Sequence, residues 1–209
     1  MRQADEPDTV VSEMAAASAP AEDAVRIRPI TVAEYYRMGE VGIIGPDERV
    51  ELLDGELIAM PPIRPEHDYS VRRLNAYFQQ RFAGRASVSV QGPVTLDPIS
   101  EPQPDVMLNA LPEERYAVAH PTPDEALLVV EVAQSSLPYD RGRKLRAYAR
   151  RRVREYWIVD LRHERVDVYR EPAGEGYVVH SVVGRGGAVA PQAFPDAAVP
   201  VDEILPPAR

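Results

Sequence analysis

The sequence LLVVEVAQSS at residues 127–136, together with DRGRKLRAYARRRVREYWIVD at residues 140–160, carries most of the information about how this chain folds. The first segment is almost wholly apolar up to Ala133, which is typical of a β-strand covered on both faces of its sheet. The pattern of residues 140–152 predicts a helix. From Glu155 onward, EYWIVDLRHERVDVYR predicts two strands joined by a short turn. This half of the chain should therefore form a sheet with a helix packed against it.

Signals on either side extend this pattern. Thr31 and Glu34 have the spacing of a capping box, which predicts a helix through Met38. Asp54-Gly55 lies between two apolar runs, which predicts a β-hairpin. Apolar residues at three- and four-residue steps predict a further helix, which follows the prolines of residues 61–65 and ends near residue 82. Other strands are predicted at residues 87–96, 102–108 and 176–183.

The order of these elements is helix, hairpin, helix, strands, helix, strands. It predicts an α/β fold of the mixed α+β type. A central mixed β-sheet is expected to be flanked by helices, and a β-hairpin is expected near the N-terminal end.

The composition excludes several classes of protein. The 209 residues are 44% hydrophobic and include 0 cysteines, which allows a packed core but no disulfide, thiolate metal site or cysteine nucleophile. No apolar run approaches the roughly 20 residues of a membrane span, so we expect a soluble, cytoplasmic protein without a membrane partner. Residues 1–25 hold six acids and one base, and they are predicted to be a disordered acidic tail preceding a folded domain of residues 26–209.

Two carboxylates stand in unusual places. Glu131 interrupts the apolar strand, where an isolated ionised carboxylate is costly unless it is paired, protonated or bound to a metal. One interpretation is an ion pair with an arginine at the edge of the sheet; the other is a metal ligand or a general base with a perturbed pKa. Asp105 opens a short strand after two prolines. If these strands are neighbours, about 4.8 Å apart, the two carboxylates repel each other unless a divalent cation lies between them.

Lys144 is the only lysine among the 24 basic residues of the chain. On the predicted helix it lies beside Tyr148 and points toward the margin of the sheet. A compact ammonium in that position could orient a water molecule or stabilise charge on a phosphate, whereas composition alone could also leave one lysine by chance. Four arginines form a separate stripe, which is either a solvated face or a surface for phosphate contact: Arg143, Arg146, Arg150 and Arg154.

These residues resemble a known pattern. The segments ELLDGELIAMPP, Pro104-Asp105, LLVVEVAQSS and DRGRKLRAYARRRVREYWIVD, with the histidine of RPEHDYSVRRL, resemble the Uma-type restriction-endonuclease family of the PD-(D/E)XK nuclease superfamily. The resemblance covers about residues 30–205. It implies a restriction-endonuclease-like fold, hydrolysis of phosphodiester bonds in DNA, and Mg²⁺ or Mn²⁺ as the cofactor. A homodimer is possible by analogy with other nucleases of this fold.

The resemblance also implies roles for individual residues. Asp105, Glu131 and the main-chain carbonyl of Val132 would hold the metal ion, which lowers the pKa of a bound water. Ala133 occupies the position of the motif lysine, and Lys144 would replace that lysine from the following helix. Supporting roles fall to Tyr148 beside Lys144, Glu51 as a third acid and His67 as a residue lining the cleft, although His67 could equally be a packing residue at a helix end. Arg143, Arg146 and Arg150 would contact the nucleic acid.

The absence of a lysine at position 133 supports a second hypothesis, in which the chain is an inactive nuclease-like module that serves as a DNA-binding or adaptor subunit. A third is a metal-dependent hydrolase of another phosphoester. The sequence has no P-loop, GxGxxG, HExxH or nucleophile-elbow motif, so nucleotide-driven, zinc-protease and serine-hydrolase functions lack support.

Overall fold

A computed structural model describes residues 26–208, and the predicted acidic tail at residues 1–25 lies outside them. Its largest element is a six-stranded sheet with the order β3-β4-β5-β6-β7-β8. Only β5 and β6 pair in parallel; every other neighbouring pair is antiparallel. The strands are β3 Ser87–Val90, β4 Val106–Asn109, β5 Ala126–Ala133, β6 Glu155–Asp160, β7 Arg165–Ala173 and β8 Gly176–Gly184. The predicted mixed sheet is thus confirmed.

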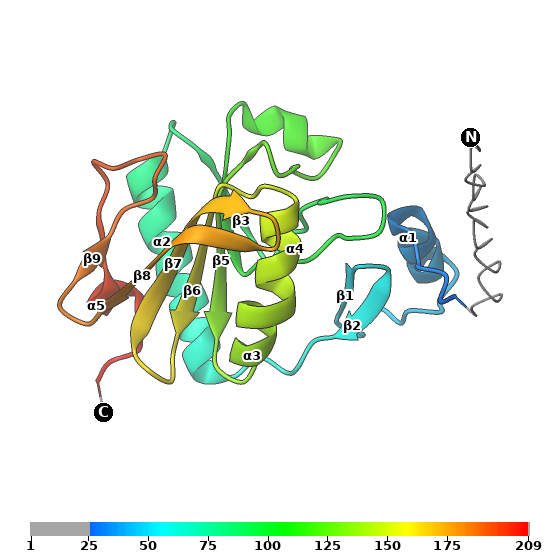
Figure 1. Ribbon diagram of the computed structural model, residues 1–209, viewed down its shortest axis with the longest axis horizontal. Coiled ribbons are helices and arrows are strands. Elements are labelled where there is room, and N and C mark those ends of the chain that lie inside the picture. Colours follow the sequence, from blue (N-terminus) through cyan, green and yellow to red (C-terminus); the bar gives the residue numbers. More distant parts are fainter. Residues whose placement is uncertain (1–25, 209) are drawn as a thin grey trace, which may run out of the picture.

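Helices cover both faces of this sheet (Figure 1). On one face, α2 (Pro65–Phe82) buries an apolar stripe that includes Leu74 and Phe78 against residues such as Val130 and Trp157. On the other face lies the connection between β5 and β6, which a parallel pair requires. This connection is helical from Leu137 to Arg150, through α3 (Leu137–Tyr139), a π-helical turn (Asp140–Lys144) and α4 (Leu145–Arg150).

The segments before the sheet follow local rules. Thr31 forms the predicted capping box with Glu34 at the start of α1 (Val32–Glu40). Strands β1 (Val50–Leu53) and β2 (Glu56–Ala59) form the predicted hairpin. Its turn residues Asp54 and Gly55 have φ values of 52° and 75°, which is the conformation for which Asp-Gly turns are selected.

The remaining elements are short. A 3₁₀ helix, Glu113–Ala117, lies between β4 and β5. The chain ends with β9 (Ala188–Val189), β10 (Val199–Pro200) and α5 (Val201–Ile204), which pack against the α2 side of the sheet. Among residues 26–208, no helix combines the length and the apolar character needed to cross a membrane.

Two local predictions were wrong. The strand predicted for residues 87–96 ends at Val90, because Gly92 and Pro93 leave the ladder. Alternation with a period of two, counted from Glu131, also predicts Leu127 on the face of Glu131, but the register of β5 shifts opposite Leu108 and Asn109. This irregularity turns Leu127 toward the α2 side of the sheet, whereas Val129 and Ala133 remain on the α4 side.

Candidate active site

The predicted acids meet at one cavity of about 370 Å³. Its walls come from the β1–β2 hairpin, the first turn of α2, the loop after β5 and the helical segment before α4. Four acids and four basic residues line it: Glu51, Asp105, Glu131, Asp140, Arg49, Arg64, His67 and Lys144. Six of the predicted site residues, drawn from segments far apart in the chain, therefore line one cavity: Glu51, His67, Asp105, Glu131, Val132 and Lys144.

Asp105 immediately precedes β4, and Glu131 lies on the neighbouring strand β5. Val106 of β4 pairs with Val130 of β5, and the antiparallel register brings Asp105 beside Glu131. The Oδ2 atom of Asp105 accepts a hydrogen bond of 2.8 Å from the main-chain N–H of Val132 and lies 3.1 Å from Nε2 of His67. His67 thus lines the cavity and contacts the aspartate. These contacts fix the orientation of a carboxylate that is only 6% exposed.

Glu131 is paired with a lysine, not with an arginine as one interpretation of the sequence held. Its Oε1 atom accepts hydrogen bonds from Nζ of Lys144 at 2.8 Å and from the hydroxyl of Tyr148 at 2.9 Å. Burial raises the pKa of Glu131 well above its usual value, the Lys144 ammonium opposes this shift, and the charges of neighbouring acids add to it.

Glu51 supplies the second carboxylate at Lys144. Its Oε2 atom lies 3.1 Å from Nζ of Lys144 and accepts a hydrogen bond of 3.0 Å from the main-chain N–H of Gln103. Its Oε1 atom accepts one from the hydroxyl of Tyr139, also at 3.0 Å. Glu51, predicted as a third acid of the site, thus contacts the ammonium of Lys144.

Lys144 is held as a cation between two carboxylates. Burial alone would lower the pKa of Lys144, but the charges of Glu131 and Glu51, with that of Asp140, raise it well above its usual value. A lysine in this state cannot accept a proton near neutral pH, so it can act only through its charge and its hydrogen bonds. The π-helical turn ends at Lys144, and π turns of this kind occur frequently at functional sites.

Asp140 and Tyr139 also line the cavity, and the sequence analysis missed both. Burial raises the pKa of Asp140 to about 6, while the charge of Lys144 acts in the opposite direction. The spacing of Asp140 and Lys144, four residues apart on a helical segment, was the signal that could have identified this acid.

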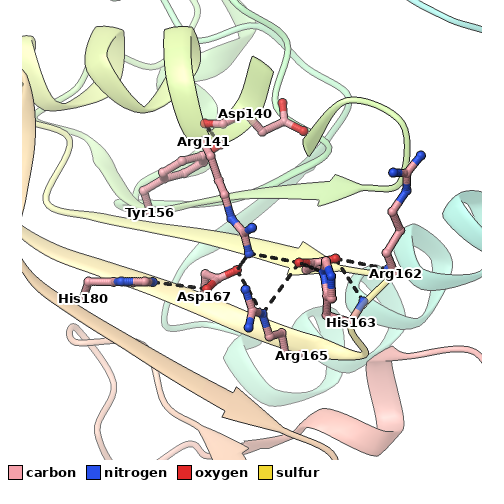
Figure 2. A network of polar contacts seen from close by, with 9 residues as sticks. Asp140, Arg141, Tyr156, Arg162, His163, Arg165, Asp167 and His180 are labelled. Atoms are coloured by element: carbon pink, nitrogen blue, oxygen red, sulfur yellow. Dashed lines mark hydrogen bonds and ion pairs between the residues drawn. The ribbon is translucent and has the colours of Figure 1, made fainter. Parts of the chain in front are cut away.

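Figure 2 shows how the segment that carries Lys144 is anchored to the sheet. Arg141 donates to Asp160 at 2.9 Å and also pairs with Asp167, and both carboxylates are fully buried. Partly exposed histidines complete the network, since His163 lies 2.7 Å from Asp160 and His180 lies 3.1 Å from Asp167. The π-helical turn therefore carries Lys144, and it is attached to β6 and β7 by the ion pairs of Arg141.

The predicted nucleic-acid-binding arginines do not line the cavity. Arg143 pairs with Glu56 at 2.7 Å and donates to the carbonyl of Leu53 at 2.8 Å. Arg150 pairs with Asp54 at 2.5 Å and with Glu175 at 3.0 Å. These contacts attach the π-helical turn and α4 to the β1–β2 hairpin, and α4 to the turn between β7 and β8. Arg146 is exposed and makes no ion pair among residues 26–208.

The donor set for a metal ion is small. The remaining carboxylate oxygens, Oδ1 of Asp105 and Oε2 of Glu131, have no hydrogen-bond partner in the described part of the chain, although both residues line the cavity. No group of three or more His, Asp or Glu side chains within residues 26–208 is arranged to hold a metal. An ion here would have two carboxylates and would complete its shell with main-chain oxygen and water. Mg²⁺ tolerates such a set because it usually keeps several waters.

Comparison with known proteins identifies a family and a similar fold. The profile of the family Uma2, described as "Putative restriction endonuclease", matches residues 32–202. The fold is similar to a crystal structure described as a "putative nuclease belonging to DUF820" from Anabaena variabilis, with a TM-score of 0.64 and 14% identity over 84% of this chain and 97% of that chain. This likeness confirms the predicted restriction-endonuclease-like fold. No curated protein sequence matches the chain.

Proposed function

Because the chain belongs to the Uma2 family, we propose that it is a nuclease that hydrolyses phosphodiester bonds in DNA with the help of a divalent metal ion. The observation that carries this proposal is the convergence of Asp105, Glu131 and a protonated Lys144 in one cavity. Two oriented carboxylates with a fixed cation beside them suit a reaction in which negative charge develops on a phosphate.

The metal ion would be Mg²⁺ or Mn²⁺, held by the free oxygens of Asp105 and Glu131 with the carbonyl of Val132. When bound, such an ion polarises the phosphate and lowers the pKa of a coordinated water. The protein's own residues have separate tasks. His67 and the N–H of Val132 fix the Asp105 carboxylate, while Tyr148 and Lys144 occupy one oxygen of Glu131 and leave the other free.

Lys144 would supply positive charge at the buried end of the cavity. It cannot act as a general base, because its pKa is raised by the adjacent acids. Its ammonium is a three-donor group, and two of its directions are used by Glu131 and Glu51. The third is left for a phosphate oxygen or a water molecule.

The inactive-module hypothesis rested on Ala133, and the structure weakens that argument. Ala133 is fully buried among apolar residues on the α4 side of β5. The ammonium of Lys144 reaches Glu131 from the following helix, so a lysine on the strand is not needed to place a cation there. The hypothesis still makes a distinct prediction, since an inactive module need not bind a divalent metal.

The proposal is tested by incubating the full chain with single-stranded, duplex and branched DNA in Mg²⁺, in Mn²⁺ and in a chelator. We expect metal-dependent cleavage that falls at least about 100-fold in Asp105→Asn and Glu131→Gln. Asp124→Asn is the matched control, because Asp124 is exposed and lies outside the cavity lining. Equal residual activity in all three variants would assign the cleavage to a contaminant or to another site.

A further inference from the structure

Two arginines of the cavity lining have no carboxylate partner in the part of the chain that the structure describes. Most arginines of the described part of the chain form ion pairs with acids. Arg143 and Arg150, which pair with acids of the β1–β2 hairpin, are typical. Arg49 and Arg64 line the cavity, yet neither takes part in an ion pair among residues 26–208. Within the described residues, the only hydrogen bond of the Arg49 guanidinium runs to the carbonyl of Pro61, at 3.4 Å.

These two arginines are more exposed to solvent than the acids of the cavity. Asp105 and Glu131 are 6% and 4% exposed, whereas Arg49 and Arg64 are exposed. Arg49 immediately precedes β1, and Arg64 is the residue before the first turn of α2. The cavity thus has an acidic floor with a buried ammonium and a rim that carries two permanently charged guanidinium groups.

The wall between the two arginines is apolar. It consists of Met60, Pro61, Pro62 and Ile63, all of which line the cavity. Ile63 is 44% exposed, although large apolar side chains are normally buried where they can be. An apolar wall between two cations is complementary to a ligand that alternates charged and apolar parts, as a nucleic-acid strand does with its phosphates and bases.

Resting on the proposed function, we infer that Arg49 and Arg64 form a phosphate-binding rim that grips a single strand of nucleic acid on either side of the phosphate at the floor. The planar guanidinium binds phosphate through two parallel hydrogen bonds, and an unpaired one need not break an existing ion pair to do so. An acidic floor repels a polyanion, so a cationic rim is needed to bring it in.

The burial of the floor favours a single strand as the ligand. The carboxylates lie within a cavity of about 370 Å³ and are almost inaccessible from outside. A flexible strand can bend one phosphate inward while its neighbours stay at the rim. A rigid duplex would have to be opened or distorted first, which costs several kcal/mol for enzymes that act on extruded nucleotides.

The test measures binding apart from cleavage. A fluorescently labelled single-stranded oligonucleotide is titrated with the full chain in a chelator, and anisotropy is recorded over a range of salt concentrations. Arg49→Gln and Arg64→Gln should each weaken binding, by roughly tenfold for the loss of a charge-assisted contact. Each should also reduce the slope of log K against log salt by about 0.7, the value for one phosphate contact on a single strand.

Two other arginines provide the comparison. Arg152→Gln removes the same charge from an exposed position outside the cavity lining, where Arg152 forms no ion pair with any of residues 26–208, and it should bind like the wild type. Arg146→Gln tests the rival surface on α4. If Arg146→Gln reduces the salt slope and the rim variants do not, the arginine stripe binds the strand and the inference is wrong.

The remaining outcomes separate this inference from the proposed function. Cleavage by the wild type with unaltered binding in Arg49→Gln and Arg64→Gln would overturn the rim and leave the nuclease intact. Rim-dependent binding without cleavage of any substrate would keep the rim and overturn the nuclease. A duplex of the same length that binds as tightly as the single strand, or a wild type that binds no strand, would overturn the inference.

Discussion

Replacing Lys144 by methionine removes an ammonium while preserving most of the volume of the side chain. Lys144 is 3% exposed, and the side chains of its partners Glu131 and Glu51 are 5% and 1% exposed. Water can therefore replace the lost contacts of 2.8 and 3.1 Å only in part. Removing one partner of a buried ion pair costs about 3–5 kcal/mol, because the other charge stays buried and uncompensated.

This cost should be visible as a lower melting temperature. For a domain of this size, 1 kcal/mol corresponds to about 2–4 °C, so Lys144→Met should melt about 6–20 °C below the wild type in a chelator. Calorimetry or circular dichroism at neutral pH measures the difference. The double variant Glu131→Gln/Lys144→Met is the control and should recover part of the loss, because it removes one of the two stranded carboxylates.

A divalent cation should compensate for the missing ammonium. A ligand that binds only the folded state stabilises it by about 2.7 kcal/mol at a concentration 100 times its Kd. Mg²⁺ or Mn²⁺ should therefore raise the melting temperature of Lys144→Met more than that of the wild type, without restoring cleavage. A Lys144→Met protein within about 1 kcal/mol of the wild type would refute the reasoning, since it would mean that the buried carboxyl groups do not need the ammonium as a partner.

Three further changes test other parts of the structure. Burial raises the pKa of Asp140 to about 6. The free energy of unfolding is therefore highest below about pH 4, and about 3 kcal/mol of it is lost as the pH rises through 6. Asp140→Asn should lack this loss in urea titrations. Arg141→Gln leaves two buried aspartates with fewer cations and should lower stability by about 2–3 kcal/mol, with a fall in cleavage because the turn carrying Lys144 loosens. Gly55→Ala should cost more than Gly174→Ala in the same assay, because both have positive φ but only at Gly55 would the new Cβ lie 2.2 Å from Pro29; equal losses would contradict this account.

Much of the fold follows from local rules that the sequence displays directly. The capping box at Thr31, the Asp54-Gly55 turn and the apolar strand around Val130 each depend on residues within a few positions of one another. Turn chemistry and apolar periodicity are properties of such short segments, and they predicted the elements and the mixed sheet without reference to the rest of the chain. The unusual glutamate in that strand and the single lysine were visible in the same way.

The tertiary structure decided which partners these residues have. Glu51 meets a lysine 93 positions later, and Arg143 and Arg150 turn to the hairpin acids instead of to solvent. No periodicity encodes such pairs, because they depend on which surfaces the packed helices and sheet bring together. Burying an unpaired charge costs much free energy. An ammonium enclosed with carboxylates must therefore be paired, whereas an exposed arginine need not be. The sequence by itself therefore determined which residues were chemically out of place, and only the packing of the chain determined that they share one cavity.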